Sequence, residues 1–518
     1  MIKLFGLACL IGILAVLATP VETYARRGDM GFFGGISEGR RLPRTTETIV
    51  LEQGNRRGNN NNNQLDFRYK ELIFLNGGDP IQFEGIFRLN TGQPDPNEVA
   101  GNFEVRHRVL ASPDAEDGAL SITRDMRFNV EYRREGSQTI FFYDINRQNW
   151  SETISVPDVG DFVLDPRMSS FVVSTIQDQQ PGVSFYSGTM HARLVYNFDG
   201  SIVTVEKSGE FYGFHSAWSA SETHRIDVTV ERDGWAIQYQ IRPSVSVNKI
   251  LQFRHNEPTV ISFEGNFMEI HQSFAGLRYD FFHMPHEMWE VPQQGNISLE
   301  TVNVFEQLPA PAHLGFLRGN PAEDDIHRLF AMQVLQGDPR FFVPEQAITR
   351  GQFMTALARA IKLPIEELNI RPLRGRDPVT VELFTDVNNN RPEFRYIQAI
   401  QRAGVAFGRA DGKFYFDYPI QRQEAFATII RALGLTNLGL DPTVVTPFMD
   451  SDDIAYWAIR EVAVANMLGI IQPDENGNIL PRQAISKGEA AALFNHLIEY
   501  MRTGLISDYT EQIVNIAR

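Results

Sequence analysis

The sequence predicts two folded parts: an all-β module of antiparallel, sandwich-like strands, followed by an all-helical repeat region. Segments such as 140–145 and 225–230 alternate apolar and polar residues between Gly, Asp and Pro turns, as strands with one buried face do. From about residue 321 the apolar residues instead recur at helical spacing, as in 352–361. A unit of helix, glycine-containing loop and helix occurs three times in this second part, which indicates internal repetition.

Length and charge exclude several classes of protein. The chain has 518 residues, too many for one ordinary domain, and its 43% hydrophobic and 22% charged residues are typical of a globular protein. The net charge of −16 argues against binding to nucleic acid through bulk electrostatics. The single cysteine, Cys9, excludes both a disulfide framework and a thiolate metal site.

The N-terminal residues predict export. Lys3 precedes the apolar run 4–17, and Ala25 ends a stretch of small residues suited to cleavage, so residues 1–25 are expected to be a signal peptide. Residues 26–65 are rich in Gly and Asn and poor in apolar residues, which predicts a disordered linker. No later segment approaches the run of about 20 apolar residues that a spanning helix needs, so we expect no transmembrane segment in the mature chain.

The β domain is expected over residues 66–310, and its role stays open. No pair of carboxylates stands out as a general acid and base, so the sequence neither supports nor excludes a glycosidase. His283 and His286 lack the i, i+4 spacing of a helical zinc site, and we predict neither a metal nor a cofactor. Four tryptophans either stack on sugars or pack in the core. They are Trp150, Trp218, Trp235 and Trp289.

The three helical units align on an isoleucine that is followed two residues later by a base. The isoleucines are Ile348, Ile420 and Ile485, and the bases are Arg350, Arg422 and Lys487. Thr349-x-x-Gln352 and Ser486-x-x-Glu489 are capping boxes, which place Arg350 and Lys487 at the first helical position. A base there opposes the helix dipole, which suggests a compensating partner.

These residues resemble the S-layer homology (SLH) domain family. Phe384-Thr-Asp386, Gly404 to Gly408 and Ile420 to Ala425 follow the family pattern in the second copy, and the third copy matches with Phe448-Met-Asp450, Trp457-Ala458 and Ile485 to Ala490. The first copy has no F-x-D opening. The resemblance gives repeats at 321–375, 376–440 and 441–503, with a tail at 504–518. It implies a pseudo-threefold helical domain that anchors exported proteins to the bacterial wall.

The resemblance also implies the ligand, an anionic and often pyruvylated secondary wall polysaccharide or a peptidoglycan-linked polymer. We expect the free amides at each helix start and the adjacent base to bind it together. The alternative is that the bases pair with neighbouring Asp or Glu and only hold the repeats together. The predicted polysaccharide-binding residues are Arg350, Arg422, Lys487, Thr349, Ser486 and Trp457.

The sequence as a whole favours a secreted, non-enzymatic cell-surface protein. We expect the SLH repeats to hold it at the wall, and the β domain to have a structural or interaction role, with self-assembly in a surface layer as one form of it. The rival hypothesis is a polysaccharide- or wall-degrading enzyme whose active site lies in the β domain and which uses the same anchor. No nucleic-acid partner is expected.

Overall fold

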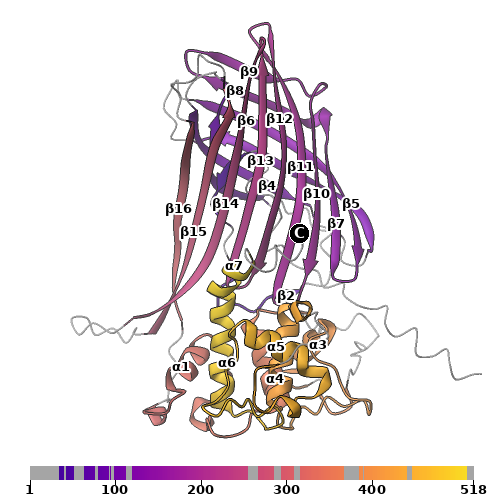
Figure 1. The fold of residues 1–518 in the computed structure, drawn as a ribbon, viewed down its shortest axis with the longest axis vertical. Coiled ribbons are helices and arrows are strands. Elements are labelled where there is room, and N and C mark those ends of the chain that lie inside the picture. Colours follow the sequence, from indigo (N-terminus) through magenta and orange to yellow (C-terminus); the bar gives the residue numbers. More distant parts are fainter. Residues whose placement is uncertain are drawn as a thin grey trace, which may run out of the picture.

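The structure is a computed structural model that describes most of the chain beyond residue 33. The predicted signal peptide and the last nine residues lie outside the described residues, which are 34–39, 42–51, 64–75, 80–92, 94, 98–112, 120–254, 266–284, 293–308, 315–366, 384–388, 390–439 and 446–509. Long strands form one large sheet, and a helical domain lies against one end of it (Figure 1).

The sheet has 15 strands that pair antiparallel, and most of them follow one another in the order of the chain. It curls so that its two ends approach each other, since β16 contacts both β3 and β1. The strands are β1 Gly35–Ser37, β3 Gln64–Ile73, β4 Ile81–Thr91, β5 Ala100–Ala111, β6 Ser121–Glu135, β7 Gln138–Ile145, β8 Ser151–Val156, β9 Gly160–Leu164, β10 Ser170–Gln179, β11 Val183–Phe198, β12 Ser201–Ser216, β13 Ser219–Arg232, β14 Trp235–Arg254, β15 Asn266–His283 and β16 Gln294–Gln307.

Tight turns set the register of the longest hairpins. Asp199 and Gly200 join β11 to β12, and Asp233 and Gly234 join β13 to β14, all four with positive φ. An Asp-Gly pair is the usual sequence for a two-residue turn of this kind, because both positions need the left-handed region. The inward side chains of these strands are mostly apolar and buried, so the alternation in the sequence correctly predicts an all-β module.

The N-terminal segment is part of the folded structure at residues 34–39 and 42–51. β1 pairs with β3 and also contacts β14, β15 and β16, so it lies where the ends of the sheet approach. The segment then reaches the helical domain, where β2 (Val50–Leu51) pairs in parallel with β17 (Ile365–Glu366). These residues fall within the linker predicted over 26–65, whose low apolar content gave no sign of pairing with distant strands.

The helical region consists of three copies of the repeat, arranged around a pseudo-threefold axis. At its centre the backbone N–H groups of Ile348, Ile420 and Ile485 each donate to the carbonyl of the next of the three, at 3.0 to 3.2 Å, and form a closed ring. All three side chains are buried. The fold class predicted for this region is confirmed. The helices are α1 Glu323–Ala331, α2 Arg350–Ala360, α3 Phe394–Arg402, α4 Arg422–Leu433, α5 Ile459–Met467, α6 Lys487–Glu499 and α7 Leu505–Asp508.

The two parts share one hydrophobic core across their junction. Trp218, at the end of the sheet next to the helices, is fully buried and donates its indole N–H to the carbonyl of Ala360 at 2.7 Å. Arg502, which follows α6, donates to the carbonyl of Lys249 on β14 at 2.6 Å. Cutting the chain between the two parts would therefore expose apolar surface on both. In the described part of the chain, no helix is both long and apolar enough to cross a membrane.

Candidate functional site

The three predicted bases occupy equivalent positions in the repeats. Helices α2, α4 and α6 begin at Arg350, Arg422 and Lys487, respectively. Both predicted capping boxes are present, with Thr349 and Ser486 each accepting from the backbone N–H three residues later. In the second copy Gln421 makes no capping bond with its side chain. The hydroxyls of Thr349 and Ser486 thus hold the helix starts.

The amides at the helix starts are occupied within the protein, so the expectation that they are free is wrong. In each copy the first two helical N–H groups donate to backbone carbonyls in the loop of a neighbouring repeat. The N–H groups of Lys487 and Gly488, for example, donate to the carbonyls of Gln346 and Pro344 at 2.8 and 2.9 Å. The sequence could not reveal this, because these acceptors lie 58 or more residues away in the chain.

Arg350 is almost fully buried between the first and second repeats. Its Nε donates to Glu424 Oε1 at 2.7 Å, and its other nitrogens donate to the carbonyls of Phe414 and Phe407. Its guanidinium also lies 4.3 Å from the centre of the Phe414 ring. The side chain is 8% exposed. Arg350 therefore has the geometry of the alternative interpretation, a base that holds two repeats together.

Arg422 repeats this arrangement between the second and third copies, with more exposure. It donates to Glu489 Oε1 at 2.5 Å and to the carbonyl of Ile479 at 2.6 Å, and its side chain is 19% exposed. Burial opposes ionisation of Glu489, but hydrogen bonds from Ser486 and the charge of Arg422 outweigh it and lower the pKa of this carboxyl. The pair is thus a charged contact at the edge of the repeat interface.

Lys487 differs from the two arginines because no carboxylate of the described residues forms an ion pair with it. The position equivalent to Glu424 and Glu489 is Gln352 in the first copy. The ammonium of Lys487 donates to Gln346 Oε1 at 2.7 Å and lies 5.6 Å from the centre of the Phe342 ring. Burial lowers the pKa of Lys487. Among the described residues this base has no ion pair, so its positive charge is uncompensated.

Two aspartates of the F-x-D openings have a role that the sequence reasoning did not assign. Asp386 accepts from the backbone N–H groups of Phe414 and Tyr415 at 2.7 and 2.6 Å. Asp450 does the same for Ile479 and Leu480 in the third copy. Tyr415 and Leu480 have positive φ, which is uncommon for a side chain of this size. Each carboxylate therefore holds a loop with an uncommon backbone conformation, and this loop accepts a hydrogen bond from the base of the preceding repeat, Arg350 or Arg422.

Trp457 lies apart from the helix starts. It is 49% exposed, and the guanidinium of Arg431 is 5.7 Å from its ring centre. The neighbouring Tyr456 is 92% exposed, and Met449 of the F-x-D opening is 80% exposed. Trp457 is thus the one predicted residue that does not lie at the start of α2, α4 or α6.

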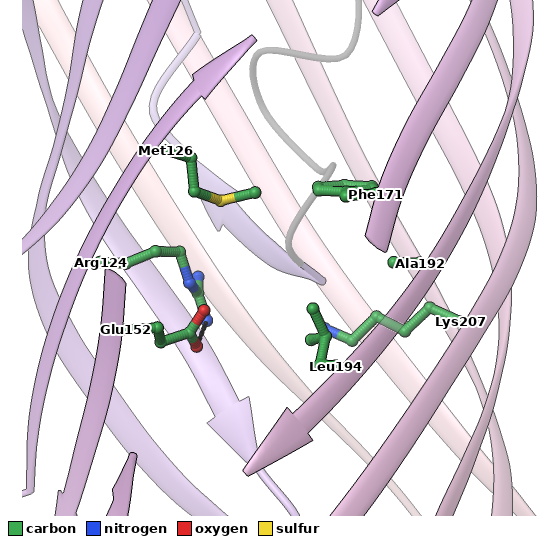
Figure 2. Close-up of a pocket in the computed structure, with 7 residues that line it drawn as sticks. All are labelled: Arg124, Met126, Glu152, Phe171, Ala192, Leu194 and Lys207. Carbon is green, nitrogen blue, oxygen red and sulfur yellow. Dashed lines mark hydrogen bonds and ion pairs between the residues drawn. The ribbon is translucent and has the colours of Figure 1, made fainter. Parts of the chain in front are cut away.

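The interior of the β module holds a second cluster of charges (Figure 2). Arg124 lies between two carboxylates, 3.0 Å from Glu71 and 2.6 Å from Glu152. The hydroxyl groups of Tyr69 and Tyr196 donate to these carboxylates, and burial raises the pKa of both tyrosines. The cavity beside Arg124 has a volume of about 10 Å³, space for one water molecule. A cavity of this size holds no sugar.

Comparison with known proteins identifies the repeats. The family model described as the S-layer homology domain matches residues 318–354, 383–426 and 447–491. The three C-terminal copies are therefore SLH domains, as predicted, and the first match begins close to the expected start at residue 321.

Relatives match over about a third of the chain. An exoglucanase of Acetivibrio thermocellus is 28% identical over 186 residues, which are 35% of this chain and 16% of that protein. An amylopullulanase of Thermoanaerobacterium thermosulfurigenes is 27% identical over 35% of this chain and 9% of its own length. An S-layer protein of Bacillus licheniformis is 28% identical over 33% and 18%, respectively. The matched part of the chain thus spans less than a fifth of the length of each of these relatives. The SLH domains indicate a secreted, wall-associated surface protein.

Proposed function

We propose that the SLH domains hold this protein at the cell wall by binding an anionic wall polysaccharide, and that Lys487 is the base that contributes most to binding. The observation that carries the proposal is the uncompensated charge of Lys487 at the interface between the third and first repeats. Arg350 and Arg422 face Glu424 and Glu489, whereas Lys487 faces the neutral Gln346. A carboxylate or pyruvyl group on the polymer would supply the missing negative charge.

The three bases accordingly have different roles in this proposal. Lys487 contacts the ligand, and Arg422 supports binding at the second interface, where its side chain is partly exposed. Arg350 is a positioning residue, because every nitrogen of its buried guanidinium is bonded within the protein. Thr349 and Ser486 orient the helices that carry the bases. Trp457 offers a separate exposed ring on which a sugar of the same polymer stacks.

We assign the β module a structural or interaction role rather than a catalytic one. Trp150 and Trp218 are buried, which supports the packing interpretation of these residues. Trp235 packs against the core, and Trp289 lies outside the described residues. The glycosidase relatives match over lengths of about the size of the repeat region, so their names give no reason to place an active site in the β module. Self-assembly in a surface layer remains one form of the interaction role.

Substitution of Lys487 in the full-length chain tests the proposal. Lys487→Gln removes the charge and keeps much of the side chain, and Arg193→Gln removes one charge from the outer face of β11 as a matched control. A charge-assisted contact stabilises by about 1.5 to 3 kcal/mol, so Lys487→Gln is expected to weaken binding to purified walls by about ten-fold or more. Unchanged binding by Lys487→Gln, at unchanged melting temperature, would reject the assigned role of this lysine.

A further inference from the structure

A cluster of arginines on the outer face of the β module has no role in the SLH site. Arg88 on β4 lies directly opposite Arg108 on β5, and Arg106 on β5 lies directly opposite Arg127 on β6. Like charges directly opposite each other destabilise a sheet. Two such pairs on three adjacent strands, in a chain of net charge −16, indicate a surface kept positive despite a cost in folding stability.

The nearby carboxylates compensate only half of this cluster. Arg88 makes two hydrogen bonds to Asp66, at 2.8 and 2.7 Å. Arg106 makes two to Asp125, although Asp125 lies directly opposite Arg108 in the register. Asp66 and Asp125 are thereby engaged by Arg88 and Arg106, respectively.

Arg108 and Arg127 have no ion-pair partner in the described part of the chain. The Nε atom of Arg108 is buried and makes no hydrogen bond there. Burial and the positive charges of Arg106 and Arg88 lower the pKa of Arg108. A side chain in this position gains from any anion that approaches the sheet from outside.

Other outward-facing residues complete the surface. Arg68 on β3 adds a fifth positive charge, and Glu84 on β4 and Glu104 on β5 bring the facing carboxylates to four, so the arginines still outnumber them by one. Asn90 lies directly opposite Arg106, and its side-chain carbonyl is buried with no hydrogen-bond partner among the described residues. Asn129 lies opposite Glu104 and is exposed. Amides next to guanidinium groups suit a ligand that carries hydroxyls as well as negative charges.

We propose that this arginine surface, formed by Arg68, Arg88, Arg106, Arg108 and Arg127, binds a polyanionic glycan. Neighbouring strands are about 4.8 Å apart and alternate residues about 7 Å apart, so adjacent guanidinium groups can each face a different anionic group of one chain. Planar guanidinium forks bind sulfate, phosphate and carboxylate oxygens in pairs. The open sheet face suits an extended polymer. The side-chain amides of Asn90 and Asn129 can accept hydrogen bonds from the hydroxyls of this polymer and donate hydrogen bonds to them.

The test uses the full-length chain with dextran sulfate as the probe and neutral dextran as the comparison. We expect dextran sulfate to bind with an affinity that falls as salt rises, and neutral dextran not to bind. In the double variant Arg108→Gln/Arg127→Gln we expect at least a ten-fold loss of affinity for dextran sulfate. Its melting temperature is expected to stay the same or rise, because two repulsive contacts are removed. Arg193→Gln is expected to bind as the unmodified protein does.

Three outcomes would overturn the inference. The first is equal binding of dextran sulfate by the double variant. The second is equal loss in the Arg193→Gln control, which would indicate a general charge effect. The third is binding to phosphatidylglycerol vesicles that the double variant loses while dextran sulfate is not bound, which would assign the surface to a lipid headgroup. Dextran sulfate binding by the double variant and wall binding by Lys487→Gln are separate measurements on different residues, so this inference and the proposed role of Lys487 fail independently.

Discussion

Glu269 on β15 offers a sharp test of how the sheet and the helical domain are joined. Its carboxylate is fully buried, accepts from the backbone N–H of Thr45 at 2.9 Å, and lies 2.5 Å from His271 and 3.7 Å from the ammonium of Lys249. Lys249 in turn lies 4.8 Å from the centre of the buried Trp218 ring. We expect Glu269→Gln to destabilise the whole protein, because it removes the carboxylate that faces the buried ammonium of Lys249.

The magnitude follows from the pKa of this carboxyl. Burial opposes its ionisation, but the bond from His271, the charge of Lys249 and the amide of Thr45 outweigh burial and lower the pKa to about 2. The unfolded value is about 4.5. A difference of about 2.5 pH units corresponds to about 3 kcal/mol of folding stability. Because the folded pKa is depressed, this stabilisation is fully present above pH 4.5 and is lost as the pH falls toward 2.

The assay is urea unfolding followed by tryptophan fluorescence, with Trp218 reporting on the junction. At pH 7 we expect Glu269→Gln to be about 3 kcal/mol less stable than the unmodified protein. As the pH falls below about 4.5 the difference is expected to shrink, since protonation removes the same interaction from the unmodified chain. A difference below about 1 kcal/mol at pH 7, or one that does not change with pH, would show that the Glu269 carboxylate does not stabilise the junction in this way.

Two further predictions concern the repeat interfaces. A Cβ at Gly351 would lie 2.3 Å from the Phe416 ring, whereas a Cβ at Gly488 would meet nothing closer than 3.4 Å. Gly351→Ala is therefore expected to cost about 1 to 3 kcal/mol, and Gly488→Ala to be neutral or to raise the melting temperature; equal effects would contradict the packing. Asp450→Asn is expected to cost about 1 to 2 kcal/mol in urea unfolding, and the exposed Asp452→Asn almost nothing, so equal midpoints would rule out the loop-holding role.

Local sequence patterns predicted the elements but not their partners. The capping boxes at Thr349 and Ser486 depend on residues three positions apart, and the strand alternation depends on residues two apart, so both are readable from the sequence. The bond between Arg350 and Glu424 joins residues 74 positions apart, and only the closed arrangement of the repeats brings them together. The same holds for the N-terminal segment, whose pairing with β3 and β17 has no local signal.

The structure was also needed to find which of the three bases has no carboxylate beside it among the described residues. From the sequence alone Arg350 is the strongest candidate, because its copy has both a capping box and a planar guanidinium. The structure buries that guanidinium and leaves Lys487 as the base without a carboxylate. The difference arises because Gln352 stands where the other two copies have Glu424 and Glu489. Only the structure shows that the base of the third repeat faces the first repeat.

Sedimentation of the full-length chain with purified cell walls tests most directly whether the protein attaches to the wall through a polysaccharide. One wall sample retains its secondary polysaccharide, and the other is stripped of it by acid extraction. We expect the protein to sediment with intact walls, added salt to weaken this binding, and stripped walls to leave the protein in the supernatant. Equal sedimentation with stripped walls would show that the protein does not attach through this polysaccharide.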